Sequence, residues 1–183
     1  ADTQHYRLVE ASRSYQSALI VLSEEQHPER FALANMNNAI AILAMPMTQA
    51  SDQVRLGVAV QSLRAALRVY RPQTHAYEWS SSQMNLANAL QYLPSKHREE
   101  NLQEAVELYE EVLAFRSPRS DPTGYGRVLA NQANALAHLA VFEHAEAKYR
   151  EARELFVRAG DADAVEVIDR QLVQIEEQRG SRS

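Results

Sequence analysis

A six-residue motif that occurs three times constrains the fold of this chain more than any other feature. The copies read NMNNAI at residues 35–40, NLANAL at residues 85–90 and NQANAL at residues 131–136, with offsets of 50 and 46 residues. Asparagine is a weak helix former, because its side chain competes for backbone hydrogen bonds. A pair of asparagines three residues apart that returns at a similar spacing therefore indicates an internal repeat.

A second motif alternates strictly with the first. It consists of an alanine followed four residues later by a tyrosine or leucine, and it begins at Ala11, Ala59, Ala105 and Ala145. A spacing of four places both side chains on one face of a helix. We refer to the segments that carry the first motif as asparagine helices and to those that carry the second as tyrosine helices. The residues four positions after the alanines are Tyr15, Leu63, Tyr109 and Tyr149.

The alternation predicts an all-α chain that forms a single domain over residues 1–183. The 6 prolines all lie between the predicted helices or at their edges, and Gly160 is placed to end one of them. No long alternation of Val, Ile and Thr indicates a β-sheet. The predicted helices span residues 3–22, 29–44, 53–70, 76–93, 99–116, 124–140, 143–159 and 163–179.

These motifs resemble the tetratricopeptide repeat (TPR) family. In the TPR signature, Leu-Gly lies in the first helix, Ala-x3-Phe in the second, and a proline closes the repeat. Here Leu86-Ala87 stands for Leu-Gly, Ala105-x3-Tyr109 stands for Ala-x3-Phe, and Pro118 closes a repeat. The repeats exceed the usual 34 residues, so the chain is most similar to the longer-repeat branch that includes kinesin light chain and bacterial regulatory TPR arrays.

The resemblance implies a right-handed helical solenoid of antiparallel helix pairs. It would contain about three and a half TPR-like repeats. The final helix carries an apolar stripe that suits a cap over the last repeat, whereas the first tyrosine helix has no asparagine partner. We expect that uncapped end to form a homodimer face or a docking face, or to mark the point where a longer chain was cut. The stripe of the final helix comprises Val165, Ile168, Leu172 and Ile175.

The resemblance also implies that the asparagine helices line a concave groove. Two roles remain open for the asparagines: their amides can bind the backbone of a partner segment, or they can lock adjacent repeats together. The residues expected in the groove are Asn38, Met84, Asn88, Gln91, Arg127 and Asn134. Those expected at the groove edge are Asn35, Asn85, Asn131, Trp79, Tyr92 and Tyr125.

The sequence shows little catalytic or metal-binding chemistry. Cysteine is absent, the 6 histidines do not form the paired spacing of a helical metal site, and no glycine-rich phosphate loop is present. The net charge of −5 argues against nucleic acid as a partner. No apolar run is long enough to span a membrane. We therefore expect no enzymatic activity, no cofactor, no bound metal and a cytoplasmic location.

The most direct functional hypothesis is a non-catalytic scaffold that binds a peptide or protein segment in its groove. One alternative is an assembly chaperone or accessory subunit of a multi-subunit enzyme, for example a metalloenzyme such as a hydrogenase. Another is a ligand-sensing regulatory module of a signalling or transcription protein. The residues are compatible with all three roles and identify no partner.

Overall fold

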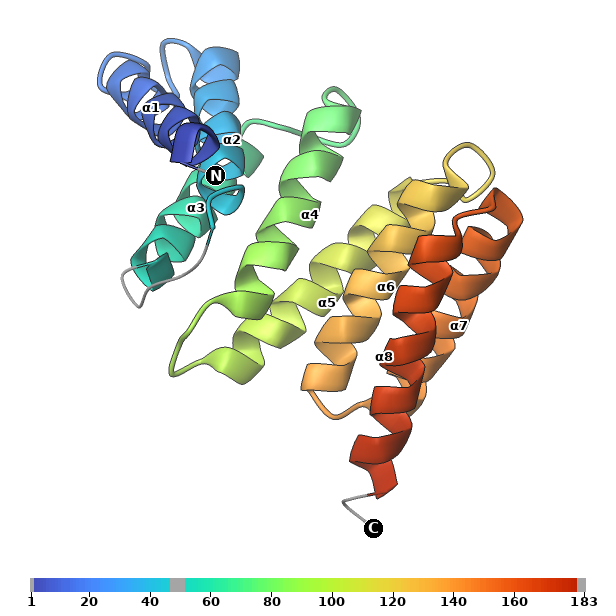
Figure 1. Cartoon of the computed structure of the whole chain (residues 1–183). Helices are drawn as coiled ribbons and strands as arrows, with labels where there is room; N and C mark the ends of the chain where they lie inside the picture. The colour runs from blue at the N-terminus through green and yellow to red at the C-terminus, as the bar shows by residue number, and fades with distance from the viewer. Residues whose placement is uncertain (1, 47–51, 181–183) are drawn as a thin grey trace. The chain divides into compact units, whose positions relative to one another are not determined.

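The computed structural model describes residues 2–46 and 52–180, and within these ranges α-helix is the only regular secondary structure (Figure 1). The prediction of an all-α chain is confirmed for this part. The predicted helix boundaries lie within a few residues of those observed. The eight helices in the described ranges are α1 (Asp2–Leu19), α2 (Pro28–Leu43), α3 (Asp52–Leu67), α4 (Ala76–Tyr92), α5 (Arg98–Phe115), α6 (Pro122–His138), α7 (Phe142–Ala159) and α8 (Ala162–Gly180).

The ends of the helices follow from local chemistry. Pro28 and Pro122 occupy the first turns of α2 and α6, where the missing amide hydrogen costs no helical hydrogen bond. At the start of α6, the carboxylate of Asp121 accepts a hydrogen bond of 2.8 Å from the backbone amide of Gly124. At the end of α7, Gly160 adopts a left-handed conformation with φ of 73°, which confirms its predicted role as a helix stop.

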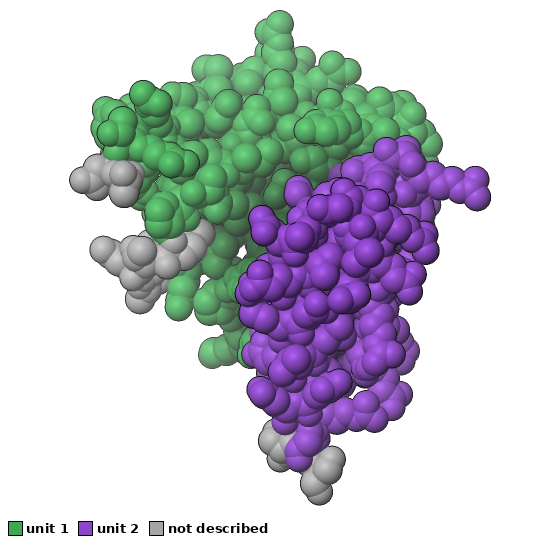
Figure 2. Space-filling view, turned by 45° about the vertical axis from the view of Figure 1, so that its right-hand side comes forward, with its two compact units in different colours: residues 1–98 green, residues 99–183 purple. Residues whose placement is uncertain are grey.

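The chain divides into two compact units, residues 1–98 and residues 99–183, where the sequence predicted one domain (Figure 2). In unit 1, each helix packs on the next, and α2 also touches α4. A buried cluster of Ala32, Met36, Ala66 and Tyr70 joins α2 to the end of α3, and Trp79 of α4 packs against it. This packing of consecutive helices is consistent with a helical repeat.

In unit 2, α6 packs on α7 and α7 packs on α8. Gly126 allows a close approach, because a Cβ atom at this position would lie 3.1 Å from the ring of Phe156. The last helix buries Ile168 and Ile175, two members of its predicted apolar stripe. The guanidinium of Arg153 on α7 also donates to Asp169 on α8, with N–O distances of 2.6 and 3.1 Å.

Candidate functional site

The side chain of Asn38 joins three helices of unit 1. Its oxygen accepts a hydrogen bond of 2.8 Å from the hydroxyl of Ser12 on α1, and its amide nitrogen donates to the hydroxyl of Ser62 on α3 at 3.2 Å. Only 2% of Asn38 is exposed. Asn38 therefore holds helices together, and the expectation that it lines a groove is corrected. The physical reason is that α2 turns this side toward α1 and α3.

The corresponding residue of unit 2, Asn134, also bonds to a neighbouring helix. Its side-chain oxygen accepts a hydrogen bond of 3.0 Å from the hydroxyl of Tyr149 on α7, and the same hydroxyl lies 3.4 Å from the side-chain oxygen of Gln171 on α8. Tyr149 is buried, whereas Asn134 is half-buried. In both units the second asparagine of the motif thus contacts the tyrosine helix that follows it, which favours the repeat-locking role.

The first asparagine of the motif makes a more local contact. The amide of Asn35 donates to the backbone oxygen of Phe31 at 3.0 Å, and the amide of Asn85 lies 3.5 Å from the hydroxyl of Ser81. Both partners are one helical turn earlier in the same helix. Asn131 is half-buried on α6.

One stripe of α4 is less buried than the rest of the helix and ends in two exposed tyrosines. Tyr77 and Tyr92 are exposed at its two ends, and Ser81, Met84 and Asn88 are half-buried between them. Their spacings of four, three, four and four residues keep all five on one face. We call this set the α4 stripe. It contains the predicted groove residues Met84 and Asn88 and the predicted edge residue Tyr92.

Gln91 was expected on the same face but is buried. Three residues beyond Asn88, the helix has turned by about 300°, which brings Gln91 toward Ala87, a fully buried position. Arg127 is exposed on α6, about two turns before Asn134. Tyr125 is half-buried at the start of α6, and Trp79 is half-buried against the unit 1 core.

A polar network in unit 2 was not foreseen from the sequence. The amide of Gln132 on α6 donates to the carboxylate of Glu110 at 2.7 Å and to the backbone oxygen of Val106 at 3.3 Å. Lys148 on α7 reaches the same carboxylate at 3.3 Å. The hydrogen bond from Gln132, supported by the charge of Lys148, lowers the pKa of Glu110 despite its partial desolvation. The sequence feature that indicates this network is Gln132, a glutamine inside the repeated motif at residues 131–136.

This network predicts a pH-dependent contribution to stability. Folding lowers the pKa of Glu110 from its usual 4.5. The ionised carboxylate therefore adds to the free energy of unfolding above pH 4.5, and this contribution is lost as the pH falls through the folded-state pKa. Between pH 6 and pH 3, Glu110→Gln should therefore lose less stability than the wild type does. The carboxylate is largely exposed, so solvent screening keeps the difference below roughly 1 kcal/mol.

Urea unfolding at both pH values measures this difference. Glu107→Gln is the matched control on the exposed side of α5. Equal pH responses of Glu110→Gln and the wild type would show that the network does not stabilise the folded state.

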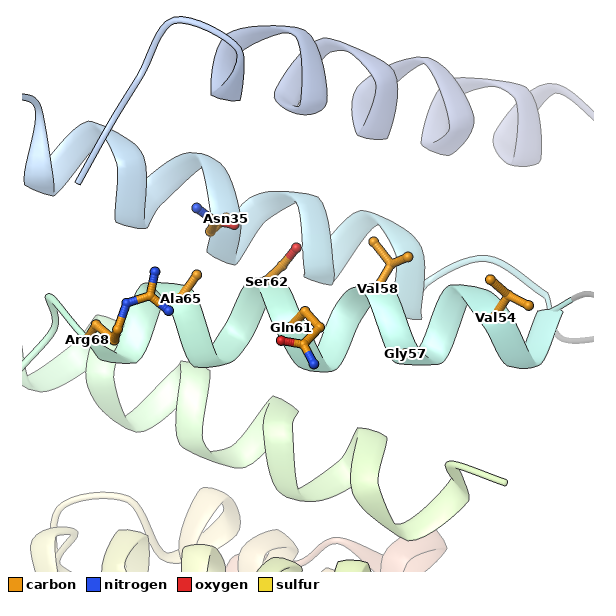
Figure 3. Close-up of a pocket in the computed structure, with 8 residues that line it drawn as sticks. All are labelled: Asn35, Val54, Gly57, Val58, Gln61, Ser62, Ala65 and Arg68. Carbon is orange, nitrogen blue, oxygen red and sulfur yellow. The ribbon is translucent and has the colours of Figure 1, made fainter. Parts of the chain in front are cut away.

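A hollow on α3 was also missed by the sequence analysis. It has a volume of about 650 Å³, and Figure 3 shows its lining residues, with Asn35 on α2 and the others on α3 or at its end. At that end, the guanidinium of Arg68 donates to Glu24 at 2.8 Å. The signal was a second apolar stripe on α3, Val54 and Val58, which is separate from the alanine and leucine of the tyrosine motif.

Comparison with known proteins identifies no family. No protein-family model matches the chain, and no curated protein matches it. No helix in the described ranges is both long and apolar enough to cross a membrane. Among the same residues, no group of three or more His, Asp or Glu side chains is arranged to hold a metal ion.

Proposed function

We propose that the protein is a non-catalytic interaction module that binds a segment of a partner protein along the α4 stripe. The helices belong to a TPR-like, right-handed solenoid in this proposal, and the stripe forms part of its concave surface. The observation that carries the proposal is the contrast around α4, where Tyr77 and Tyr92 are exposed at the two ends of one half-buried stripe while the opposite faces are buried.

The chemistry of the α4 stripe suits a protein ligand. Tyrosine provides a broad apolar surface with a hydroxyl group and is enriched among residues that dominate binding energies. The flexible thioether of Met84 adapts to irregular apolar groups.

The length of the stripe limits what it can hold. From Tyr77 to Tyr92 the helix rises about 22 Å at 1.5 Å per residue. An extended segment advances about 3.3 Å per residue, so about seven residues fit between the two tyrosines. We therefore infer a short extended segment with apolar side chains near both ends. An accessory subunit and a regulatory module would use the same surface and would differ in the partner that supplies the segment.

The proposal predicts that Tyr92→Ala weakens partner binding about tenfold or more, as expected when a tyrosine that contributes strongly to binding is truncated. The melting temperature of the Tyr92→Ala variant should differ little from that of the wild type, because 61% of Tyr92 is exposed. The partner is first obtained by co-purification with the full chain from its native host and identified by mass spectrometry. Binding isotherms of purified variants then give the dissociation constants.

Tyr6→Ala is a matched control, since Tyr6 is similarly exposed on α1 and lies outside the α4 stripe. It should leave the affinity unchanged. Val58→Glu introduces a charge into the hollow on α3 and tests that competing surface. Unchanged binding by Tyr92→Ala together with loss of binding by Val58→Glu would transfer the site to the hollow.

A further inference from the structure

Unit 1 contains a second pocket, formed where α1 and α3 both pack on α2. It has a volume of about 340 Å³ and shares Val58 with the hollow on α3. Pockets that bind small molecules have volumes of about 300–1,000 Å³, so this pocket lies at the small end of that range. We call it the α1–α3 pocket.

Part of the lining of the α1–α3 pocket is apolar. Ile42 and Met45, at the end of α2, are only 3% and 5% exposed, so they form the deep part of the pocket. Val9 of α1 is half-buried and Val58 of α3 is exposed, so these two side chains lie nearer to its mouth. The flexible thioether of Met45 can adapt to the shape of an apolar group. The deep part of the pocket therefore suits the apolar part of a ligand.

Two arginines line the same pocket, Arg13 from α1 and Arg55 from α3. Arg13 is exposed and donates to the carboxylate of Glu10, three residues earlier, at 3.0 Å. Exposed ion pairs of this kind contribute little free energy, so this guanidinium can turn to another anion at small cost. Arg55 is half-buried, and its guanidinium donates to the backbone oxygen of Pro46 at 2.9 Å and lies 3.6 Å from the sulfur of Met45. These contacts hold Arg55 beside the buried apolar part of the pocket.

The remaining polar side chains of the lining are Ser12 and Gln16, which already have partners in the protein. The hydroxyl of Ser12 donates to Asn38 at 2.8 Å and accepts a hydrogen bond of 3.3 Å from the amide of Gln16. No acidic residue is among the described residues that line the pocket. Its charged groups are thus two guanidiniums, whose planar fork of donors matches the geometry of a carboxylate.

Charge and volume limit the ligand further. Glu10 offsets one of the two positive charges, which favours a ligand with a single negative charge. At about 30 Å³ per water molecule, a volume of 340 Å³ has room for about eleven waters. A ligand of about ten non-hydrogen atoms would fill this space.

We propose that the α1–α3 pocket binds a small monocarboxylate with an apolar chain or ring. Its carboxylate lies between Arg13 and Arg55, and its apolar part packs against Ile42 and Met45. The ligand thereby connects α1 to α3 and stabilises the folded form of unit 1. This site is separate from the α4 stripe and does not depend on the partner proposed for that stripe.

Octanoate is the probe that tests the proposal, since it combines one carboxylate with an apolar chain of the inferred size. Titrated into the full chain in a calorimeter, it should bind saturably at one site, and it should raise the melting temperature. Octanol has the same chain without the charge. It should bind at least about tenfold more weakly, because it cannot accept charge-assisted hydrogen bonds from the arginines.

Variants of the two arginines locate the site. Arg13→Gln and Arg55→Gln should each weaken octanoate binding about tenfold and leave the weak binding of octanol unchanged. The exposed Arg13 can be replaced without disturbing the fold, which keeps the test valid if Arg55→Gln perturbs the chain near Pro46. Arg68→Gln is the matched control, because Arg68 lines the hollow on α3 and lies outside the α1–α3 pocket. It should leave octanoate binding unchanged.

Three results would overturn the proposal. Equal affinities for octanoate and octanol would show that the arginines do not bind the carboxylate. Octanoate binding that is weakened by Arg68→Gln but not by Arg13→Gln would place the ligand outside the α1–α3 pocket. Absence of saturable octanoate binding at millimolar concentrations would show that the pocket does not hold this class of ligand.

Discussion

Replacing Tyr149 by alanine is expected to lower the free energy of unfolding of unit 2 by about 3–5 kcal/mol, the usual cost of truncating a buried aromatic residue. Only 1% of Tyr149 is exposed, in the interior where α6, α7 and α8 meet. The substitution removes the ring and also leaves Asn134 without the hydroxyl that donates to it. Urea unfolding followed by circular dichroism measures the change.

Tyr149→Phe separates the two contributions. It keeps the ring and removes the hydroxyl, so it should cost about 1 kcal/mol. If Tyr149→Ala cost no more than Tyr149→Phe, the ring could not be part of a packed core. Unit 2 would then be held together by contacts other than those around Tyr149.

Replacing Asn38 by alanine is expected to destabilise unit 1 by about 2–4 kcal/mol. The substitution leaves a cavity and removes two hydrogen bonds, the one that Ser12 donates to Asn38 and the one that Asn38 donates to Ser62. Both serines are themselves buried. Buried polar groups without partners cost about 1–3 kcal/mol each. Asn37→Ala is the matched control, because the adjacent asparagine is half-buried, and it should change stability by less than roughly 0.5 kcal/mol.

A triple variant tests the cause of the loss at Asn38. Replacing Asn38 by leucine and both Ser12 and Ser62 by alanine removes all three side chains that form these two hydrogen bonds, so it should recover much of the lost stability. If Asn38→Ala and Asn37→Ala were equally mild, the buried bonds would contribute nothing. Asn38 would then be available for a surface role.

The helices were predictable because their signals are local. Proline positions, Gly160 and the spacing of the two motifs follow from backbone geometry and helical periodicity, and these determine where each helix begins and ends. The stripe of the last helix was predictable for the same reason. The division into two units was not, since it depends on which helices pack together in space, and helical periodicity does not contain that information.

The rotation of α2 could not be derived from its sequence. Residues 35–40 match residues 131–136 closely, yet Asn38 is buried and Asn134 is half-buried. The difference depends on Ser12 and Ser62, which lie on other helices and offer hydroxyl groups to Asn38. A repeat motif predicts that a helix packs against others, but which of its faces is buried depends on the side chains of the neighbouring helices.

The candidate site was predicted in part. Met84, Asn88 and Tyr92 could be placed on an outward stripe because helical spacing alone defines it. Gln91 could not be placed, since it lies at the border between the exposed and buried sides of α4. The hollow on α3 and the network around Gln132 arise from contacts between helices, which single-helix periodicity does not contain.

Amide hydrogen exchange of the full chain with and without its co-purified partner tests the proposed function most directly. Binding along the α4 stripe should slow exchange across residues 76–92, with the largest change near Met84 and Asn88, and Tyr92→Ala should reduce that protection. Protection confined to residues 52–67, with residues 76–92 unchanged, would contradict the proposed site and assign partner binding to the hollow on α3.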